Sequence, residues 1–169
     1  MAIVFTPETA FKNREPFPSV FLAGTIEMGK SVDWQADVIE RLKNENVTLF
    51  NPRRVIAPEL EDEIDFQINW ELDRLQEADI IFMFLASGTI SPISLLELGI
   101  YLNSGKPLIA VCEPGYTRRQ NVHVTMKRFY NVANIHLTDN LDEGMNILHN
   151  YINVTSCLQE LEHMIKYPE

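Results

Sequence analysis

The feature that most constrains the fold is the uninterrupted apolar run "DIIFMFLA" at residues 79–86. A strand that is apolar on both faces is typical of the centre of a parallel sheet covered by helices on its two sides. Weaker strand patterns occur before and after this run, and we expect four further strands, at residues 19–23, 47–52, 106–112 and 134–137.

Helical patterns separate these strands. The expected helices lie at residues 33–44, 63–78, 91–105, 122–130 and 141–166, with the last range holding one or two helices. Asp33 is expected to cap the first helix, and Ser91 followed by Pro92 to open the third. In the second, Ile64, Ile68, Leu72 and Leu75 have helical spacing.

The alternation of strands and helices defines the expected fold class. It predicts a three-layer α/β/α, Rossmann-like domain, doubly wound around a mostly parallel five-stranded sheet. The 169 residues suit one domain, residues 1–169, because the sequence has no internal repeat or linker. Ligands of such sheets bind at the carboxyl ends of the strands, which here include Ala23-Gly24-Thr25 and Ala86-Ser87-Gly88.

Composition excludes several classes of function. The formal net charge of -10 argues against a nucleic-acid polymer as partner, because polyanions bind clustered Lys and Arg. We expect no membrane segment, since no apolar run approaches the roughly 18–20 residues that span a bilayer. We expect no secretory signal and two buried free thiols, Cys112 and Cys157, so the expected location is cytoplasmic. The four histidines lack metal-ligand spacing, and no metal site is expected.

The stretch "GTIEMGKS" at residues 24–31 matches the phosphate-binding P-loop pattern and follows a strand. Its interior argues against that reading, because Glu27 would repel a triphosphate, and Thr25 and Ile26 are β-branched where a P-loop favours small residues. Only Glu113 stands where an acid for magnesium is needed. A P-loop nucleotide kinase is therefore the weakest of the functional alternatives.

A carboxylate within an apolar helix is more informative. Glu97, in "SPISLLELG", is flanked by leucines, and such surroundings are costly for a charge unless it is paired or used. Asp73 follows Asn69 by four residues on the preceding helix, so the two side chains are expected to project together. Two carboxylates at the mouth of a parallel sheet suggest glycosyl chemistry. The alternatives are a surface Glu and an ordinary solvated Asp-Arg pair.

Four segments together resemble the nucleoside 2-deoxyribosyltransferase-like superfamily. They are "VFLAGTIEMG", "QINWELDRLQEADIIF", "SLLELG" and "GKPLIAVCEPGYTRRQNV", and the resemblance runs from about residue 19 to about residue 137. It implies that Glu97 is the nucleophile and that Asp73 assists it. It also implies that Gly24 and Thr25, with Ile26 beside them, line the sugar or phosphate pocket, so the P-loop match is coincidental.

At position 91 the sequence differs from one branch of this superfamily, because it has Ser there. Many transferases of free nucleosides carry Asp six residues before the nucleophile, whereas the deoxynucleoside 5'-monophosphate N-glycosidases carry Ser there and a hydroxyl residue at the position of Thr25. The resemblance thus implies a small-molecule nucleoside or nucleotide as partner and no cofactor. It leans toward phosphate binding by Ser91 and Thr25, with Asn69 also near the substrate.

The superfamily usually forms homo-oligomers in which a neighbour closes the site. The resemblance implies the same here, and Asn121 is the residue expected in that role. Hydrolysis and base exchange both remain open, as do the base and the sugar. A nucleotide-binding sensor that has lost turnover is the alternative from a different functional class.

Overall fold

The computed structural model describes residues 1–9, 16–26, 31–55, 59–129 and 134–167. The strands are β1 (Ile3–Phe5), β2 (Ser19–Gly24), β3 (Thr48–Phe50), β4 (Ile80–Leu85), β5 (Leu108–Cys112) and β6 (Ile135–Thr138). The helices are α1 (Trp34–Leu42), α2 (Glu61–Glu77), α3 (Pro92–Tyr101), α4 (Arg119–Lys127) and α5 (Leu141–Lys166).

The six strands form one sheet in the order β1-β3-β2-β4-β5-β6, and every neighbouring pair is parallel. All six residues of β4 are buried, as the apolar run predicts for a central strand. The chain reverses its winding direction between β2 and β4, and that point is where ligands of such folds bind. The expected fold class is confirmed, with one strand more than expected.

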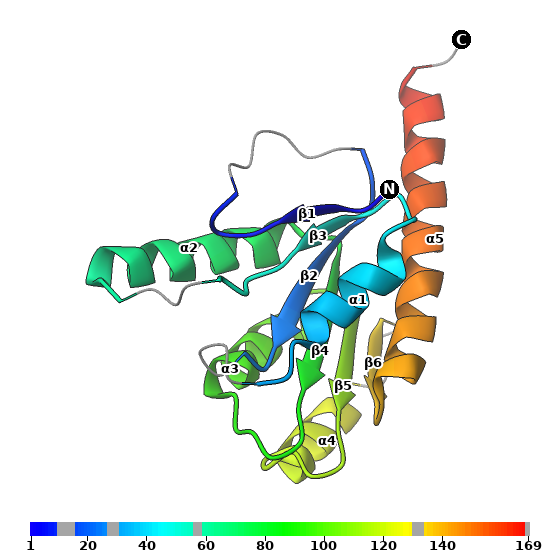
Figure 1. The fold of residues 1–169 in the computed structure, drawn as a ribbon. Helices are drawn as coiled ribbons and strands as arrows, with labels where there is room; N and C mark the ends of the chain where they lie inside the picture. Colours follow the sequence, from blue (N-terminus) through cyan, green and yellow to red (C-terminus); the bar gives the residue numbers. More distant parts are fainter. Residues whose placement is uncertain (10–15, 27–30, 56–58, 130–133, 168–169) are drawn as a thin grey trace.

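Helices cover both faces of the sheet (Figure 1). One buried cluster joins the sheet to α1 and α5 through residues such as Val38 and Leu148. The other joins it to α2, α3 and α4 through residues such as Trp70, Leu98 and Met126. Two hydrophobic cores on opposite faces of one sheet make the three-layer architecture.

Two details differ from the expectation, and a third answers the point that the sequence left open, the number of helices in residues 141–166. The sixth strand is β1, which pairs with β3 at the sheet edge through three residues, too few to give a clear pattern. Residues 141–166 form one continuous helix, capped by the side chain of Asn140. On α2, Leu75 is buried, but Ile64, Ile68 and Leu72 are exposed, so helical spacing there marks a face that this chain leaves uncovered.

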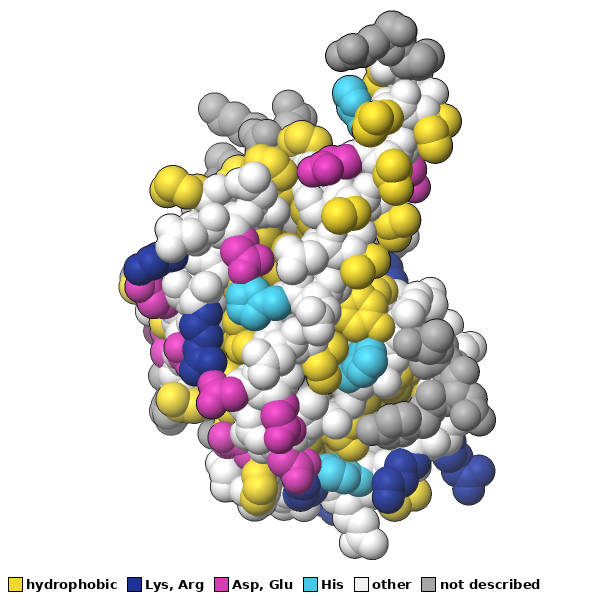
Figure 2. All heavy atoms as spheres, turned by 90° about the vertical axis from the view of Figure 1, so that its right-hand side faces the viewer, with side chains coloured by type: hydrophobic (Ala, Val, Ile, Leu, Met, Phe, Trp, Pro, Cys, Tyr) yellow, Lys and Arg dark blue, Asp and Glu magenta, His cyan; other side chains and the backbone are white. Residues whose placement is uncertain are grey.

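The second half of α5 extends past the sheet (Figure 1). Hydrophobic side chains follow this projecting part of the helix (Figure 2). The exposed ones are Val154, Leu158, Leu161, Met164 and Ile165. Cys112 is buried, but the prediction that Cys157 is buried is wrong, because it lies on this projecting half. None of the helices among the described residues is long and apolar enough to cross a membrane.

Candidate active site

A cavity of about 700 Å³ lies at the carboxyl ends of the strands. Its walls come from the end of β2, the segment after β3, helix α2, and the segment that leads into α3. Most of the lining is apolar, and its polar members are Arg54, Gln67, Glu71, Ser91, Ser94 and Glu97. A mostly apolar cleft with a few convergent polar groups is the usual form of a small-molecule site.

Glu97 is the most perturbed carboxyl group of this cavity. It sits on α3, five residues after Pro92, where the helix begins, and it is 8% exposed. Burial is the main cause, and the nearby charge of Glu71 the second, of a rise in the pKa of Glu97 to about 8. A carboxyl group with a pKa in this range is typical of functional sites, because a structural surface Glu keeps its hydration.

Glu71 on α2 is the second carboxyl group of the cavity. Burial raises its pKa, and the hydrogen bond that it accepts from the side-chain amide of Gln67 opposes this rise. The same amide donates to the backbone oxygen of Pro52 at 3.0 Å, which fixes α2 to the segment after β3. Gln67 and Glu71 are four residues apart, so both project from one face of the helix.

Asp73 and Asn69, the α2 residues expected at the site, are exposed and do not line the cavity. Asp73 follows Glu71 by two residues, which turns its side chain by about 200° around the helix. The side-chain amide of Asn69 donates to the backbone oxygen of Asp65 on the same helix. Glu71 therefore stands where we expected Asp73, and the sequence-based roles of Asp73 and Asn69 stay predictions without a place in this cavity.

Gly24 closes β2 against the backbone of β4. Its φ is +133°, and a Cβ atom at this position would lie 2.2 Å from the backbone oxygen of Phe84. The next residue, Thr25, donates its backbone N–H to that same oxygen at 2.9 Å. Gly24 and Ile26 line the cavity, whereas Thr25 is 1% exposed and lies beneath it.

Three hydroxyl groups meet under the mouth of the cavity. Oγ1 of Thr25 lies 2.6 Å from Oγ of Ser91, and Oγ1 of Thr89 lies 3.2 Å from each of them. Ser91 precedes α3 in a left-handed conformation with φ 43°, and its side chain makes no capping hydrogen bond to the helix. Ser91 is thus at the N-cap position as expected, but its hydroxyl faces Thr25 and borders the cavity instead of capping the helix.

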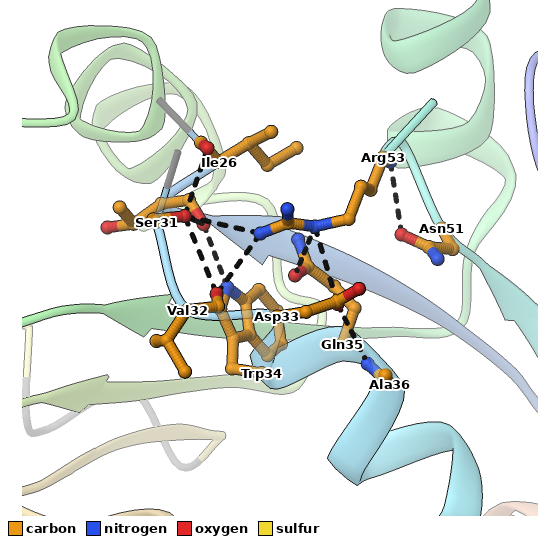
Figure 3. A network of polar contacts seen from close by, with 10 residues as sticks. Ile26, Ser31, Val32, Asp33, Trp34, Gln35, Ala36, Asn51 and Arg53 are labelled. Carbon is orange, nitrogen blue, oxygen red and sulfur yellow. Dashed lines mark hydrogen bonds and ion pairs between the residues drawn. The ribbon is translucent and has the colours of Figure 1, made fainter. Parts of the chain in front are cut away.

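Arg53 organises the segment beside the cavity (Figure 3). Its guanidinium donates to Oε1 of Gln35 at 3.1 Å, to Oγ of Ser31 at 3.2 Å and to the backbone oxygen of Val32 at 3.1 Å. It also forms an ion pair with Asp33, whose side chain caps α1 as expected. The P-loop interior, residues 27–30, lies outside the described residues.

Both tryptophans belong to the hydrophobic core. Trp34 stacks on Phe84, and its indole N–H donates to the backbone oxygen of Thr25 at 2.9 Å. Trp70 packs against Phe21, a residue of the cavity wall. The described part of the chain has no group of His, Cys, Asp and Glu that is suited to a metal ion.

Asn121 lies on α4, away from this cavity. It is exposed and borders a separate depression of about 290 Å³ together with Gln120, Val124 and Thr125. Its expected contribution to a neighbouring subunit's site stays a prediction.

Residues 17–116 match the model of the family described as nucleoside 2-deoxyribosyltransferase like. The chain belongs to this family. Membership suggests glycosyl transfer on nucleosides, and the match covers every residue that lines the described cavity. No curated protein matches the chain.

Two solved structures show how far the similarity extends. A conserved protein from Enterococcus faecalis V583 has 13% identity and a TM-score of 0.53, over 79% of this chain and 96% of that one, which shows the fold alone. A 2-deoxyribosyltransferase from the psychrotolerant bacterium Bacillus psychrosaccharolyticus has 26% identity and a TM-score of 0.44, over 56% of this chain and 72% of that one.

Sequence reasoning missed Glu71, Gln67 and Arg54. The four-residue spacing of Gln67 and Glu71 was readable, but α2 carries seven acidic side chains, and spacing alone does not say which of them turn inward. Arg54 follows a strand end directly after Asn51-Pro52-Arg53, which places it at the ligand edge.

Proposed function

We propose that the protein breaks the N-glycosidic bond of a nucleoside or nucleoside 5'-monophosphate, with Glu97 as the nucleophile. The observation that supports this most is the buried position of Glu97 beside Glu71 in a mostly apolar cavity. Family membership agrees with it, because the family is named for transfer of deoxyribose between bases.

The proposed first step forms a covalent glycosyl-enzyme. A carboxylate oxygen of Glu97 bonds to C1' of the sugar, while the bond from C1' to the base nitrogen breaks and its electron pair leaves with the base. In the second step, water or another base attacks C1', and Glu97 recovers its carboxylate. These steps use side chains alone and need neither a metal nor an organic cofactor.

We assign Glu71 the assisting role that we expected for Asp73. Its position on the cavity wall suits a hydrogen bond from a sugar hydroxyl or contact with the departing base. The amide of Gln67 keeps this carboxylate oriented, since it bonds both Glu71 and Pro52. Orientation by a neighbouring group is a common property of residues that position a substrate.

Ser91 remains the proposed contact for a 5'-phosphate, and Thr25 supports it from beneath the cavity. Ser91 borders the cavity, whereas the hydroxyl of Thr25 is already bonded to the backbone N–H of Ala86 at 3.1 Å. Thr25 therefore acts through Ser91, by fixing the direction of its hydroxyl. Replacing Ser91 with Ala should affect a monophosphate more than the corresponding nucleoside.

We also propose a homo-oligomer whose interface lies beside the site. Large hydrophobic side chains are exposed along α3 and the segment before it, at Ile90, Ile93, Leu96 and Ile100. Ile90 and Ile93 also line the cavity, so a subunit that covers this face would narrow the cavity mouth. Exposed apolar groups gathered at a site are typical of an interaction surface.

The test is to incubate the protein with a mixture of nucleosides and their 5'-monophosphates and to look for free bases by liquid chromatography with mass spectrometry. Release of a base by the wild-type protein, and none by Glu97→Gln, supports the proposal. Retention of a nucleotide without any turnover indicates the sensor alternative and contradicts the proposed chemistry.

A further inference from the structure

Ser91 has a backbone conformation that its surroundings must hold in place. Its φ of 43° lies in the left-handed region, and it is the one non-glycine residue with a positive φ in the part of the chain that the structure describes. A residue with a side chain is disfavoured there, so the conformation persists only where neighbouring contacts fix it. Ser91 also lines the cavity, six residues before Glu97. The contacts that hold Ser91 therefore bear on the shape of the candidate site.

These contacts come from the loop between β5 and α4, residues 113–118, which does not itself line the cavity. It lies against the loop between β4 and α3, residues 86–91. The backbone N–H of Gly88 donates to the backbone oxygen of Gly115 at 3.0 Å. A Cβ atom on Gly115 would lie 2.4 Å from Oγ of Ser87, and the φ of this glycine is +98°. The two loops thus approach so closely that the contact requires a glycine.

Two further hydrogen bonds join the loops on either side of this glycine. The backbone N–H of Ser87 donates to Oε2 of Glu113 at 2.9 Å. The backbone N–H of Thr117 donates to the backbone oxygen of Thr89 at 3.2 Å. The loop after β5 is therefore a support for the loop that carries Ser91.

Tyr116 is the side chain that reaches from the supporting loop to Ser91 itself. It is 3% exposed, and its hydroxyl donates to the backbone oxygen of Ile90. Burial is the main cause of a rise in the pKa of Tyr116 to about 12, and a hydrogen bond with the side chain of Ser91 opposes that rise. The phenol keeps its proton near neutral pH, so its part is to form hydrogen bonds and not to transfer a proton.

We infer that Tyr116 is a positioning residue of the candidate site, and that it holds Ser91 in the left-handed conformation which directs its hydroxyl to the edge of the cavity. The inference rests on the proposed function, in which Ser91 contacts the substrate. Tyr116 does not line the cavity, so it acts through Ser91. Without its hydroxyl, Ser91 relaxes toward an ordinary conformation, and a substrate then has to reorder the loop when it binds.

The experiment is a double-mutant cycle of Tyr116→Phe and Ser91→Ala, which measures whether the two residues act together. Tyr116→Phe removes the hydroxyl and keeps the ring, which belongs to the hydrophobic core. Tyr151→Phe is the matched control, because its hydroxyl lies 2.8 Å from Nε2 of His136 and neither residue lines the cavity. The substrate is the nucleoside or 5'-monophosphate from which the wild-type protein releases base fastest. Circular dichroism and thermal melting verify that each variant is folded.

Tyr116→Phe should raise KM by about 3- to 10-fold and leave kcat within about twofold of wild type, as expected when binding must first order the site. In the Ser91→Ala protein the same change should alter KM by less than about twofold, because the residue through which Tyr116 acts has lost its hydroxyl. Tyr151→Phe should change neither constant. Equal effects of Tyr116→Phe in both backgrounds, a decrease in kcat alone, or no effect overturns the inference. A Tyr116→Phe protein that does not fold also overturns it, because the hydroxyl would then support the whole domain.

Hydrogen–deuterium exchange tests the same inference without turnover. Mass spectrometry of peptides that cover residues 86–95 reports how often this segment opens. Tyr116→Phe should increase their deuterium uptake and leave peptides of α1 unchanged, whereas Tyr151→Phe should not affect them. If uptake does not increase, the inference is wrong even where the enzyme is active. If the wild-type protein releases no base, the proposed function fails, and an increase confined to these peptides still supports Tyr116 as the residue that positions Ser91.

Discussion

At the scale of single residues, Glu97 links reactivity to pH. Its pKa is raised to about 8 by burial and by Glu71, so at neutral pH most molecules of the ligand-free protein hold the protonated acid. A nucleophile must be ionised. We therefore expect kcat/KM to rise with pH, by about tenfold per unit below pH 8, and to level off above it. A flat profile between pH 6 and 8 would contradict this assignment.

Replacing Glu97 with Gln should remove turnover and stabilise the fold at alkaline pH. The folded state holds the proton up to about pH 8, but the unfolded chain releases it near the ordinary value of 4.5. Stability is therefore lost as pH rises through this window, by on the order of 5 kcal/mol in total. Gln carries no proton to lose. Thermal melts should show a larger advantage of Glu97→Gln over wild type at pH 8 than at pH 5, and an equal advantage at both would contradict the raised pKa.

At the scale of secondary-structure elements, Gly24 decides whether β2 can lie beside β4. A Cβ atom there would overlap the backbone oxygen of Phe84, and the positive φ disfavours any side chain. Gly24→Ala should lower the free energy of unfolding by several kcal/mol, of the size seen for steric and backbone strain. Gly99→Ala is the control, since Gly99 is helical and has open space around it. That change should stabilise α3 by about 0.5–1 kcal/mol, as measured by denaturant unfolding.

Some features of the fold and of the candidate site are predictable from the sequence, and others are not. The buried β4 run, the Asp33 cap and Glu97 were predictable because each depends on local pattern and burial. Glu71 was not, because the inward face of α2 is set by contacts with Pro52 and the sheet rather than by its own sequence. The helical spacing of Ile64 and Leu72 predicted the helix correctly, yet both side chains are exposed on the described chain. The periodicity of a single helix shows that its apolar side chains share a face, but it does not tell whether that face is buried or exposed.

At the scale of the whole molecule, the exposed apolar face of α3 predicts self-association. Leu96→Glu and Ile100→Glu place charges on that face, and neither residue lines the cavity. Both variants should shift the protein to monomers. Their activity should also fall, because no neighbouring subunit then covers and narrows the mouth of the cavity. Light scattering and activity assays over a dilution series provide the measurement. Val154→Glu, on the projecting part of α5, is the control for a charge added to another exposed apolar position. A wild-type protein that stays monomeric with full activity would contradict the oligomer.

The two tryptophans give the cavity an optical readout. The protein contains only these two, Trp34 and Trp70. One lies under the loop that carries Gly24 and Ile26, and the other packs behind the cavity wall at Phe21. Both indoles are almost fully shielded from water, so their emission should be blue-shifted and should change when a ligand moves either wall. A nucleotide titration can thus be followed by intrinsic fluorescence without a label, and single Trp→Phe variants would tell which wall responds.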